Sequence, residues 1–437
     1  MNLNDSKIPS LSDLGVSRYE GRLSSGIRVI LFEKPYAPIS LRVVFLAGSR
    51  FDPLNKDGCA HFMEHMILAG TKMFPRKDLM ALHIERFGGH MSAATGQDVL
   101  KVDLGVPEPS DVIEIIRLLN EILTGSLFSL ETIETERGSI LKEIGMSKAS
   151  LGSVTNQLWH ELIFQGTILS RLTLGKEETV KALSRNDLVD YYKKFVTAER
   201  ATIIVAGGIK MNKLLEVLES GLNMPLSGKP FVMEKNSLPT FRKDKISIKN
   251  DSTSDQVYLG FGFRTVPIFH DDVPTLDLIA EVVGGGRSSI LMQKLRYDKG
   301  LVYTASADSY NIFDSGEWFV HTSTSSKQVS ELILDIISII SEIKRSGLPA
   351  DLVQAKKMQA VKSLRVNFQT SHSWVSGHSY SEAIGLAGET APDWIRKLIA
   401  VSEKDIIRVA NRYFTDDNWY IAAAGKIEHK DLPEIRL

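Results

Sequence analysis

Hydrophobic and polar positions along the chain follow two periods. Residues 26–34 and 39–49 are short runs rich in Val, Ile and Phe, a composition typical of buried strands. Residues 110–125 carry apolar side chains three and four positions apart, which predicts an amphipathic helix that Ser110 caps and Gly125 ends. The chain therefore mixes strands with helices from its start.

The pattern of helices and strands repeats at a constant offset. Residues 187–209 align without a gap on residues 405–427, and both segments predict a helix, a short break, a buried strand and a glycine. Asp187 thus matches Asp405, an offset of 218 residues that is half the chain. Chance similarity of two helix–strand units is the alternative, and an offset of half the chain favours duplication over it.

Duplication predicts two homologous domains, residues 1–226 and residues 246–437, joined by a linker at 227–245. The stretch around this linker contains three prolines and several charges without clear periodicity, as a linker should. Strands mixed with long helices on both sides of it predict an α+β fold. We expect two α/β-sandwich domains, each a mostly antiparallel sheet packed by helices.

Composition narrows the class of protein. The 437 residues are 43% apolar and 24% charged, which is ordinary for a soluble globular protein. With 52 basic and 53 acidic side chains, the net charge of −1 offers no electrostatic argument for binding nucleic acid or an anionic membrane. A single cysteine, Cys59, excludes an intrachain disulfide and a metal site built from cysteines, and it favours a reducing compartment.

Targeting and membrane signals are not apparent. The first 15 residues lack the charged head and apolar run of a secretory signal. No apolar run approaches the roughly 18 residues of a membrane span. We therefore expect a cytoplasmic protein with neither a membrane nor a nucleic acid as its partner.

Candidate chemistry lies in residues 58–71, which read GCAHFMEHMILAGT. On a helix, residues three and four apart share a face, so His61, Glu64 and His65 project together. Two imidazoles one turn apart can bind one zinc ion, and Glu64 beside them can accept a proton from water at the metal. The alternative is three unrelated polar side chains on an otherwise apolar helix. A buried polar trio needs partners, and a metal is an efficient one.

A catalytic zinc ion takes three protein ligands, so a third must come from another element. The best source is the helix predicted over residues 129–148, with Ser129 at its cap. Glu136 and Glu143 are seven residues apart and lie nearly one above the other, at the edge of the buried stripe. Glu134 falls on the opposite face, where we expect it to be solvated. Periodicity alone does not choose between Glu136 and Glu143.

The segment HFMEH at 61–65, followed later by ETERGSILKEI at 134–144, resembles the pitrilysin-type zinc metallopeptidases, the inverzincin family M16. The resemblance covers nearly the whole chain and is closest to the two-domain, processing-peptidase-like members. It implies that His61 and His65 bind zinc and that Glu64 is the general base. It further implies Glu143 as the third zinc ligand and Glu136 as a supporting residue.

The segments GGHMSAATGQD and GGGRSSILMQKLRYDKGLVYTASA extend the resemblance. They imply that Arg296 and Tyr303 are an arginine–tyrosine pair that holds the substrate and stabilises the transition state. They also imply that Ser92 and Ala93 lie in an edge strand that pairs with the substrate backbone. The family usually has Asn-Ala there, so Ser92 puts substrate positioning in doubt. Taken without the resemblance, Arg296 is a cation near the end of a helix over 288–297 and Tyr303 an ordinary strand aromatic.

The resemblance implies a zinc-dependent endopeptidase that cleaves peptides or unfolded segments. Long members of the family form a clamshell of four such domains in one chain, so this chain corresponds to half a clamshell. We expect a homodimer, or a heterodimer with a related subunit, that encloses a chamber. Two alternatives are a maturation protease for one dedicated peptide, working with a partner subunit, and a non-catalytic subunit of such a complex.

Overall fold

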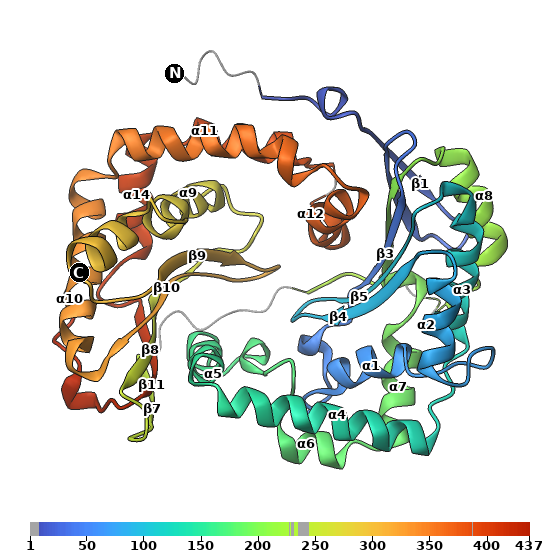
Figure 1. Ribbon diagram of the computed structural model, residues 1–437, viewed down its shortest axis with the longest axis horizontal. Helices are drawn as coiled ribbons and strands as arrows, with labels where there is room; N and C mark the ends of the chain where they lie inside the picture. Colours follow the sequence, from blue (N-terminus) through green and yellow to red (C-terminus); the bar gives the residue numbers. More distant parts are fainter. Residues whose placement is uncertain (1–7, 227, 229–230, 235–243, 387) are drawn as a thin grey trace.

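The computed structural model describes residues 8–226, 228, 231–234, 244–386 and 388–437. We call the described residues up to 226 the first half and those from 244 the second half. Most of the predicted linker at 227–245 lies outside the described residues, and the predicted domain limits remain a prediction. Two sheets dominate the molecule, one in each half, with helices around them (Figure 1). The predicted α+β class is confirmed.

The first sheet has six strands in the order β1-β2-β6-β3-β5-β4. Its strands are β1 (Ser17–Arg22), β2 (Arg28–Glu33), β3 (Ile39–Phe45), β4 (His90–Thr95), β5 (Leu100–Val106) and β6 (Ala201–Gly207). All neighbours are antiparallel except β2 and β6, which are parallel. Strand β4 therefore lies at an edge, as predicted for the segment with Ser92 and Ala93.

Helices of the first half cover one face of this sheet. They are α1 (Cys59–Ile67), α2 (Lys77–Glu85), α3 (Val112–Thr124), α4 (Leu130–Ala149), α6 (Glu177–Ala182), α7 (Arg185–Phe195) and α8 (Met211–Gly221). Their apolar stripes, such as that of α3, join the inward-facing side chains of the strands in one core. Burial of these stripes is what fixes the helices to the sheet, because apolar surface is removed from water on both sides.

The second sheet has five strands in the order β7-β11-β8-β10-β9. Its strands are β7 (Ile246–Asn250), β8 (Gln256–Thr265), β9 (Ala305–Asn311), β10 (Gly316–Ser325) and β11 (Trp419–Gly425). Here β7 and β11 are the parallel pair. Apart from α12 (Ser371–Ile384), the helices of this half are α9 (Val273–Gly284), the π-helix η7 (Met292–Asp298), α10 (Val329–Ser346), α11 (Ala350–Asn367), α13 (Ala391–Ala400) and α14 (Glu403–Tyr413).

The internal repeat is confirmed in the positions of the elements. Helix α7 and strand β6 correspond to α14 and β11, and the bounds of each pair differ by 218 residues. Both helices begin with the same capping box, Ser184 with Asp187 and Ser402 with Asp405. The strand order β2-β6-β3-β5-β4 equals β7-β11-β8-β10-β9, so the two sheets share one topology.

One helix from each half covers the sheet of the other half. Helix α5 (Leu151–Ile163) belongs to the first half but packs on β8 and β11. Helix α12 (Ser371–Ile384) belongs to the second half but packs on β3 and β6. Figure 1 shows α12 on the face of the first sheet that is opposite to α3 and α8. Each sheet thus has one face covered by its own half and one face covered by the other.

Polar contacts fasten α12 to the first sheet. The buried carboxylate of Glu382 accepts hydrogen bonds from Arg18 at 2.8 Å and from Arg28 at 3.1 Å. One turn earlier on α12, Ser379 accepts a hydrogen bond from Arg42 at 2.9 Å. Around these contacts Trp374 and Val375 are fully buried against the sheet. A buried carboxylate is stable only with such charged partners, so the interface between the halves is specific in geometry.

Two predicted helix limits are wrong. Ser110 does not cap α3, because the chain makes a single 3₁₀ turn at Pro109–Asp111 and the α-helix begins at Val112. The proline fixes φ and lacks an N–H, which suits the start of a turn and moves the cap position to Asp111. Gly125 ends the helix as predicted.

The helix predicted over 288–297 starts later and has a different hydrogen-bonding pattern. Gly286 has a φ of +84°, and the buried hydroxyl of Ser289 accepts the N–H of Met292 at 3.4 Å. The helical turns therefore begin only after Ser289, and the segment continues as a π-helix from Met292 to Asp298. The wider π-turn is common near functional positions and changes the direction of side chains on the segment.

No helix among the described residues is long and apolar enough to cross a membrane.

The contact between α5 and the second sheet contains a buried acid. Trp159 Nε1 donates a hydrogen bond to Glu317 Oε2 at 2.8 Å. Glu317 is only 6% exposed, and burial raises the pKa of its carboxyl to about 7 in spite of the tryptophan donor. Between the unfolded and folded pKa values, the folded protein keeps a proton that the unfolded chain releases. This group therefore favours the folded state at low pH and loses that effect as pH rises through about 7.

We predict that Glu317→Gln becomes more stable relative to the wild type as pH rises. The amide keeps the acceptor for Trp159 but does not ionise, so the difference in free energy of unfolding grows by up to about 3 kcal/mol between pH 5 and pH 8. Urea unfolding at several pH values measures this. The exposed Glu216→Gln is the control and should show no such trend. A difference that stays constant with pH contradicts the prediction.

Candidate metal centre

Helix α1 places His61, Glu64 and His65 on one side of the helix, at the border of the core. The other side carries Phe62, Met63, Met66 and Ile67, all buried in the core of the first half. His61 is the third residue of the helix and is only 7% exposed. Because the apolar residues fix how the helix lies on the sheet, they also fix the direction of the polar trio.

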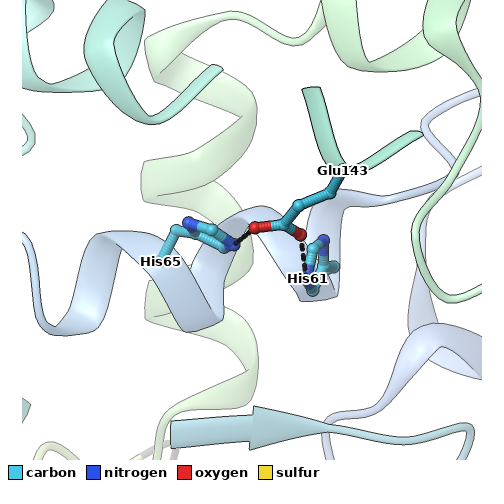
Figure 2. Close-up of side chains that lie close together, drawn as sticks. All are labelled: His61, His65 and Glu143. Atoms are coloured by element: carbon cyan, nitrogen blue, oxygen red, sulfur yellow. Dashed lines mark ion pairs between the residues drawn. The ribbon is translucent and has the colours of Figure 1, made fainter. Parts of the chain in front are cut away.

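Glu143 of the neighbouring helix α4 faces both imidazoles (Figure 2). His61 Nε2 lies 3.6 Å from Glu143 Oε2, and His65 Nε2 lies 3.6 Å from Glu143 Oε1. These distances are too long for hydrogen bonds, and one nitrogen or oxygen atom from each residue lies within 4.8 Å of the others. Ligands about 2.1 Å from a tetrahedral zinc ion are about 3.4 Å apart, so the residues present fit such an ion.

Glu136 lies about two helical turns before Glu143 and does not face both imidazoles. Its Oε2 accepts a hydrogen bond from Nδ1 of His65 at 2.8 Å, which leaves Nε2 of that ring directed at Glu143. This bond holds the imidazole in one tautomer and one orientation. The structure therefore distinguishes the two glutamates that helical periodicity leaves equivalent: Glu143 joins the cluster, and Glu136 lies behind it. Glu134 is exposed and pairs with Arg137, as expected for the solvated face.

The electrostatics of the site favour neutral imidazole at His61. Burial, and secondarily the neighbouring His65, lower the pKa of His61 to about 4. The hydrogen bond from His65 lowers the pKa of Glu136 and keeps it ionised. Burial raises the pKa of Glu64, against a hydrogen bond with Thr95. Neutral imidazoles and ionised carboxylates are the forms in which these side chains bind a metal.

The edge strand β4 runs beside α1, and its last residue, Thr95, interacts with Glu64. Burial alternates along β4, so Ser92 is exposed whereas Ala93 is half-buried toward the helices. Among the described strands only β5 pairs with β4, and the opposite edge of its backbone has no strand partner. Thr95 is a contact that the sequence did not reveal, because helical and strand periods say nothing about how α1 and β4 approach each other.

Arg296 and Tyr303 lie together but apart from the histidine cluster. The guanidinium of Arg296 is 4.7 Å from the ring centroid of Tyr303, and the tyrosine is 79% exposed. Within the described part of the chain, no hydrogen bond, ion pair or ring contact joins either residue to His61, Glu64, His65 or Glu143. The expected arginine–tyrosine pair exists as a pair, and its role in the site remains a proposal.

Asp52 is a residue of the site that sequence analysis missed. Its carboxylate accepts the backbone N–H groups of Gly58 and Ala60, both at 2.7 Å, at the start of α1. The available signal was an acidic residue a few positions before a helix whose own cap residue is glycine.

The equivalent positions of the second half carry no ligands. Counting 218 residues on, His61, Glu64, His65 and Glu143 correspond to Ile279, Val282, Val283 and Val361. These four lie on α9 and α11 and are buried in the apolar core of that half. The predicted correspondence between the motif helix and residues 275–285 thus agrees with the structure. Among the described residues, the candidate metal centre lies in the first half.

We predict that Glu136→Ala lowers zinc affinity without removing a ligand. Loss of the acceptor frees the ring of His65 to rotate, and outer partners of this kind are worth about 10–100-fold in affinity. Competition with a chromogenic chelator measures the change. Glu134→Ala on the exposed face of the same helix is the control. Equal zinc affinities of the two variants would show that Glu136 does not orient the histidine.

Comparison with known proteins locates the chain among the peptidases. A family model described as Insulinase (Peptidase family M16) matches residues 28–177, and one described as Peptidase M16 inactive domain matches residues 182–360. The boundary between the two matches precedes α7, and the second model spans the linker. The label of the second model agrees with the absence of the ligand set from α9 and α11.

Relatives align over nearly the full chain. An uncharacterized zinc protease, YmxG of Bacillus subtilis, is 25% identical over 394 residues, covering 90% of this chain and 95% of its own. The mitochondrial-processing peptidase subunit beta of Bos taurus is 25% identical over 429 residues, covering 94% of this chain and 84% of its own. A protease from Helicobacter pylori shares the fold with a TM-score of 0.86 at 18% identity, covering 94% of this chain and 99% of its own.

The two family models together span most of the chain, and the relatives match across both halves. The HFMEH segment at 61–65 lies within the residues that the Insulinase model matches. The chain belongs to peptidase family M16.

Proposed function

We propose that this chain is a zinc-dependent endopeptidase that cleaves peptides or unfolded segments. The observation that carries the proposal is the convergence of His61, His65 and Glu143 from two helices, with Glu64 beside them. Relatives named as zinc proteases support zinc as the metal. The single cysteine supports a cytoplasmic location, which is part of the proposal.

In this proposal His61, His65 and Glu143 hold the zinc ion, and Glu136 holds His65. A bound zinc ion supplies a Lewis acid that lowers the pKa of water toward about 7. Glu64 accepts the proton of the attacking water and later delivers it to the leaving amine. The half-buried position of Glu64 beside Thr95 supports this role, because burial raises the pKa of its carboxyl toward the range of a general base.

The substrate is proposed to bind as an additional strand on β4. The free backbone edge of β4 next to α1 supports this mode, in which main-chain hydrogen bonds give affinity without demanding one sequence. Ser92 and Ala93 are then the substrate-contacting residues of the strand. Serine offers fewer hydrogen-bonding groups and a shorter reach than asparagine, so we expect looser positioning of the substrate there.

Arg296 and Tyr303 are proposed to act on the site of a second subunit. Their separation from the histidine cluster within one chain, and the exposure of Tyr303, support this arrangement. A guanidinium and a phenol can donate hydrogen bonds to the negative oxygen that develops during amide hydrolysis. The partner would be a second copy of this chain or a related subunit. The two subunits together would enclose the chamber in which peptides are cut.

A second candidate function is maturation of one dedicated peptide together with a related subunit. The relative named as subunit beta of the mitochondrial-processing peptidase favours it, since that name describes one part of an assembly. The metal centre is the same in both candidates, and they differ in the partner and the range of substrates.

We predict that Glu64→Gln retains zinc but loses cleavage. The amide cannot accept a proton, and loss of general base catalysis costs at least about 10²–10⁴-fold in turnover. Cleavage of a fluorogenic unstructured peptide and the zinc content of each purified chain are the measurements. Glu134→Gln is the matched control, and the wild type treated with a chelator should lose activity. Wild-type turnover by Glu64→Gln would refute the mechanism.

We predict that two inactive variants restore activity when they are mixed. Glu64→Gln and Arg296→Ala each lack one part of a shared site, but a mixed homodimer contains one complete site. Random exchange of subunits makes half of the dimers mixed, so the mixture should regain about a quarter of wild-type activity. Peptide cleavage before and after mixing measures this. If the mixture stays inactive although subunits exchange, the shared site is wrong.

A further inference from the structure

Helix α1, which carries His61 and His65 and which we call the metal-bearing helix, has a cap residue that cannot cap it with a side chain. Its cap residue is Gly58, with a φ of +93°, and no cap hydrogen bond comes from a side chain at that position. Instead, Asp52 accepts the N–H groups of Gly58 and Ala60, both at 2.7 Å. Asp52 is 5% exposed, so these bonds lie inside the protein and water cannot replace them.

Loss of this carboxylate would act directly on His61. The first N–H groups of a helix have no partner within the helix, and buried ones are costly to leave unpaired. His61 follows Ala60 in the first turn, so fraying of that turn would displace one imidazole relative to His65 and Glu143. Asp52 is therefore placed to determine the geometry of the candidate metal centre without touching a metal.

Two residues before Asp52, Arg50 connects this segment of the chain to the second half. The 3₁₀ turn η3 (Ser49–Phe51) precedes Asp52, and Arg50 makes two hydrogen bonds to Asp314, at 3.1 and 2.9 Å. Arg50 also pairs with Asp98 at 2.6 Å, and all three side chains are at most 2% exposed. Asp314 lies in the turn between β9 and β10, far along the chain from α1.

The same turn is bonded to the end of the edge strand. The N–H of Ser49 donates to the carbonyl of Gly96 at 3.0 Å, and the N–H of Arg50 donates to that of Gln97 at 2.9 Å. These carbonyls belong to the turn that follows β4. Residues 49–52 therefore contact three parts of the molecule at once: the metal-bearing helix, the proposed substrate strand and the second half.

We propose that residues 49–52 form a positioning link in which Asp52 holds the metal-bearing helix and Arg50 ties it to Asp314 of the second half. The bidentate pair of Arg50 with Asp314 is buried and rigid, so the position of the β9–β10 turn is transmitted to η3. The neighbouring residue Asp52 then transmits it to α1. This inference rests on the proposed function, because the quantity that the link controls is the binding of zinc.

Zinc affinity of the folded, full-length chain tests the link, with zinc alone as the probe in a chelator competition. Asp52→Asn is expected to weaken zinc binding about 10–100-fold, because the amide keeps one acceptor and loses the other. Asp52→Glu keeps both acceptor oxygens of the carboxyl group and should bind zinc more tightly than Asp52→Asn. Asp272→Asn is the matched control: a buried carboxylate at the start of α9, the helix equivalent to α1, where no ligands lie.

The connection from Arg50 to Asp314 has its own test. Asp314→Asn removes the negative charge and one of the two oxygens that accept from Arg50, and zinc affinity is expected to fall several-fold although the substitution is outside the site. Combined with Asp52→Asn it should add little, since both changes act on the same segment. Circular dichroism of each zinc-free variant shows that it is folded before affinity is compared.

The outcomes separate the possible failures. Equal zinc affinities of Asp52→Asn and Asp272→Asn would overturn the role of Asp52. A loss in Asp52→Asn with wild-type affinity in Asp314→Asn would overturn the connection to the second half. If the wild type itself bound no zinc, the proposed function would fail, which is a different result from either.

Discussion

The structure depends on the need to cover both faces of two twisted sheets. The central strands of each sheet are apolar on both sides: along β2, Val29 and Leu31 face the core of the first half, whereas Ile30 and Phe32 face α12. Helices from the same half cover only one face. The remaining faces are covered by exchanging α12 and α5, so apolar burial also holds the two halves together.

That exchange decides where charged groups can lie. Because the halves meet through buried surfaces, a charge at the junction needs a partner there, and Glu382 has Arg18 and Arg28. The group of Arg50, Asp98 and Asp314 follows the same rule, with Arg50 in the segment that precedes α1. A buried ion pair adds little to stability when compared with apolar packing, but breaking one by removing a partner is costly. A metal centre needs side chains that are held in one geometry by such surroundings.

Duplication explains how one scaffold presents different side chains in its two halves. The helices α1 and α4 have the same places as α9 and α11, yet only the first pair presents imidazole and carboxylate. In the second pair valines and an isoleucine are buried at the equivalent positions. A cluster of polar side chains without a metal is costly inside a protein, so a half that does not bind metal is more stable with apolar residues there.

Much of this protein could be read from its sequence, for local reasons. The pattern of apolar residues predicted α4 and the strands β2 and β3, and the mixture of strands with helices predicted an α+β fold. The repeat predicted a second sheet, and the His61–His65 spacing predicted converging imidazoles. Helical period also showed that Glu134 is solvated. Each of these depends on residues within a few turns of one another, or on similarity between segments. The errors, at Ser110 and at residues 288–297, also have local causes, a proline turn and a glycine run.

The features that could not be predicted from the sequence involve elements that are distant along the chain. Periodicity left Glu136 and Glu143 equivalent, and the resemblance named Glu143. The approach of α4 to α1 then separated them, because a shift of one helix along the other changes which carboxylate meets both rings. The exchange of α5 and α12, the contact of Thr95 with Glu64 and the cap from Asp52 are of the same kind. Local patterns determine which face of an element is buried, but the choice of its neighbour depends on packing across the whole chain.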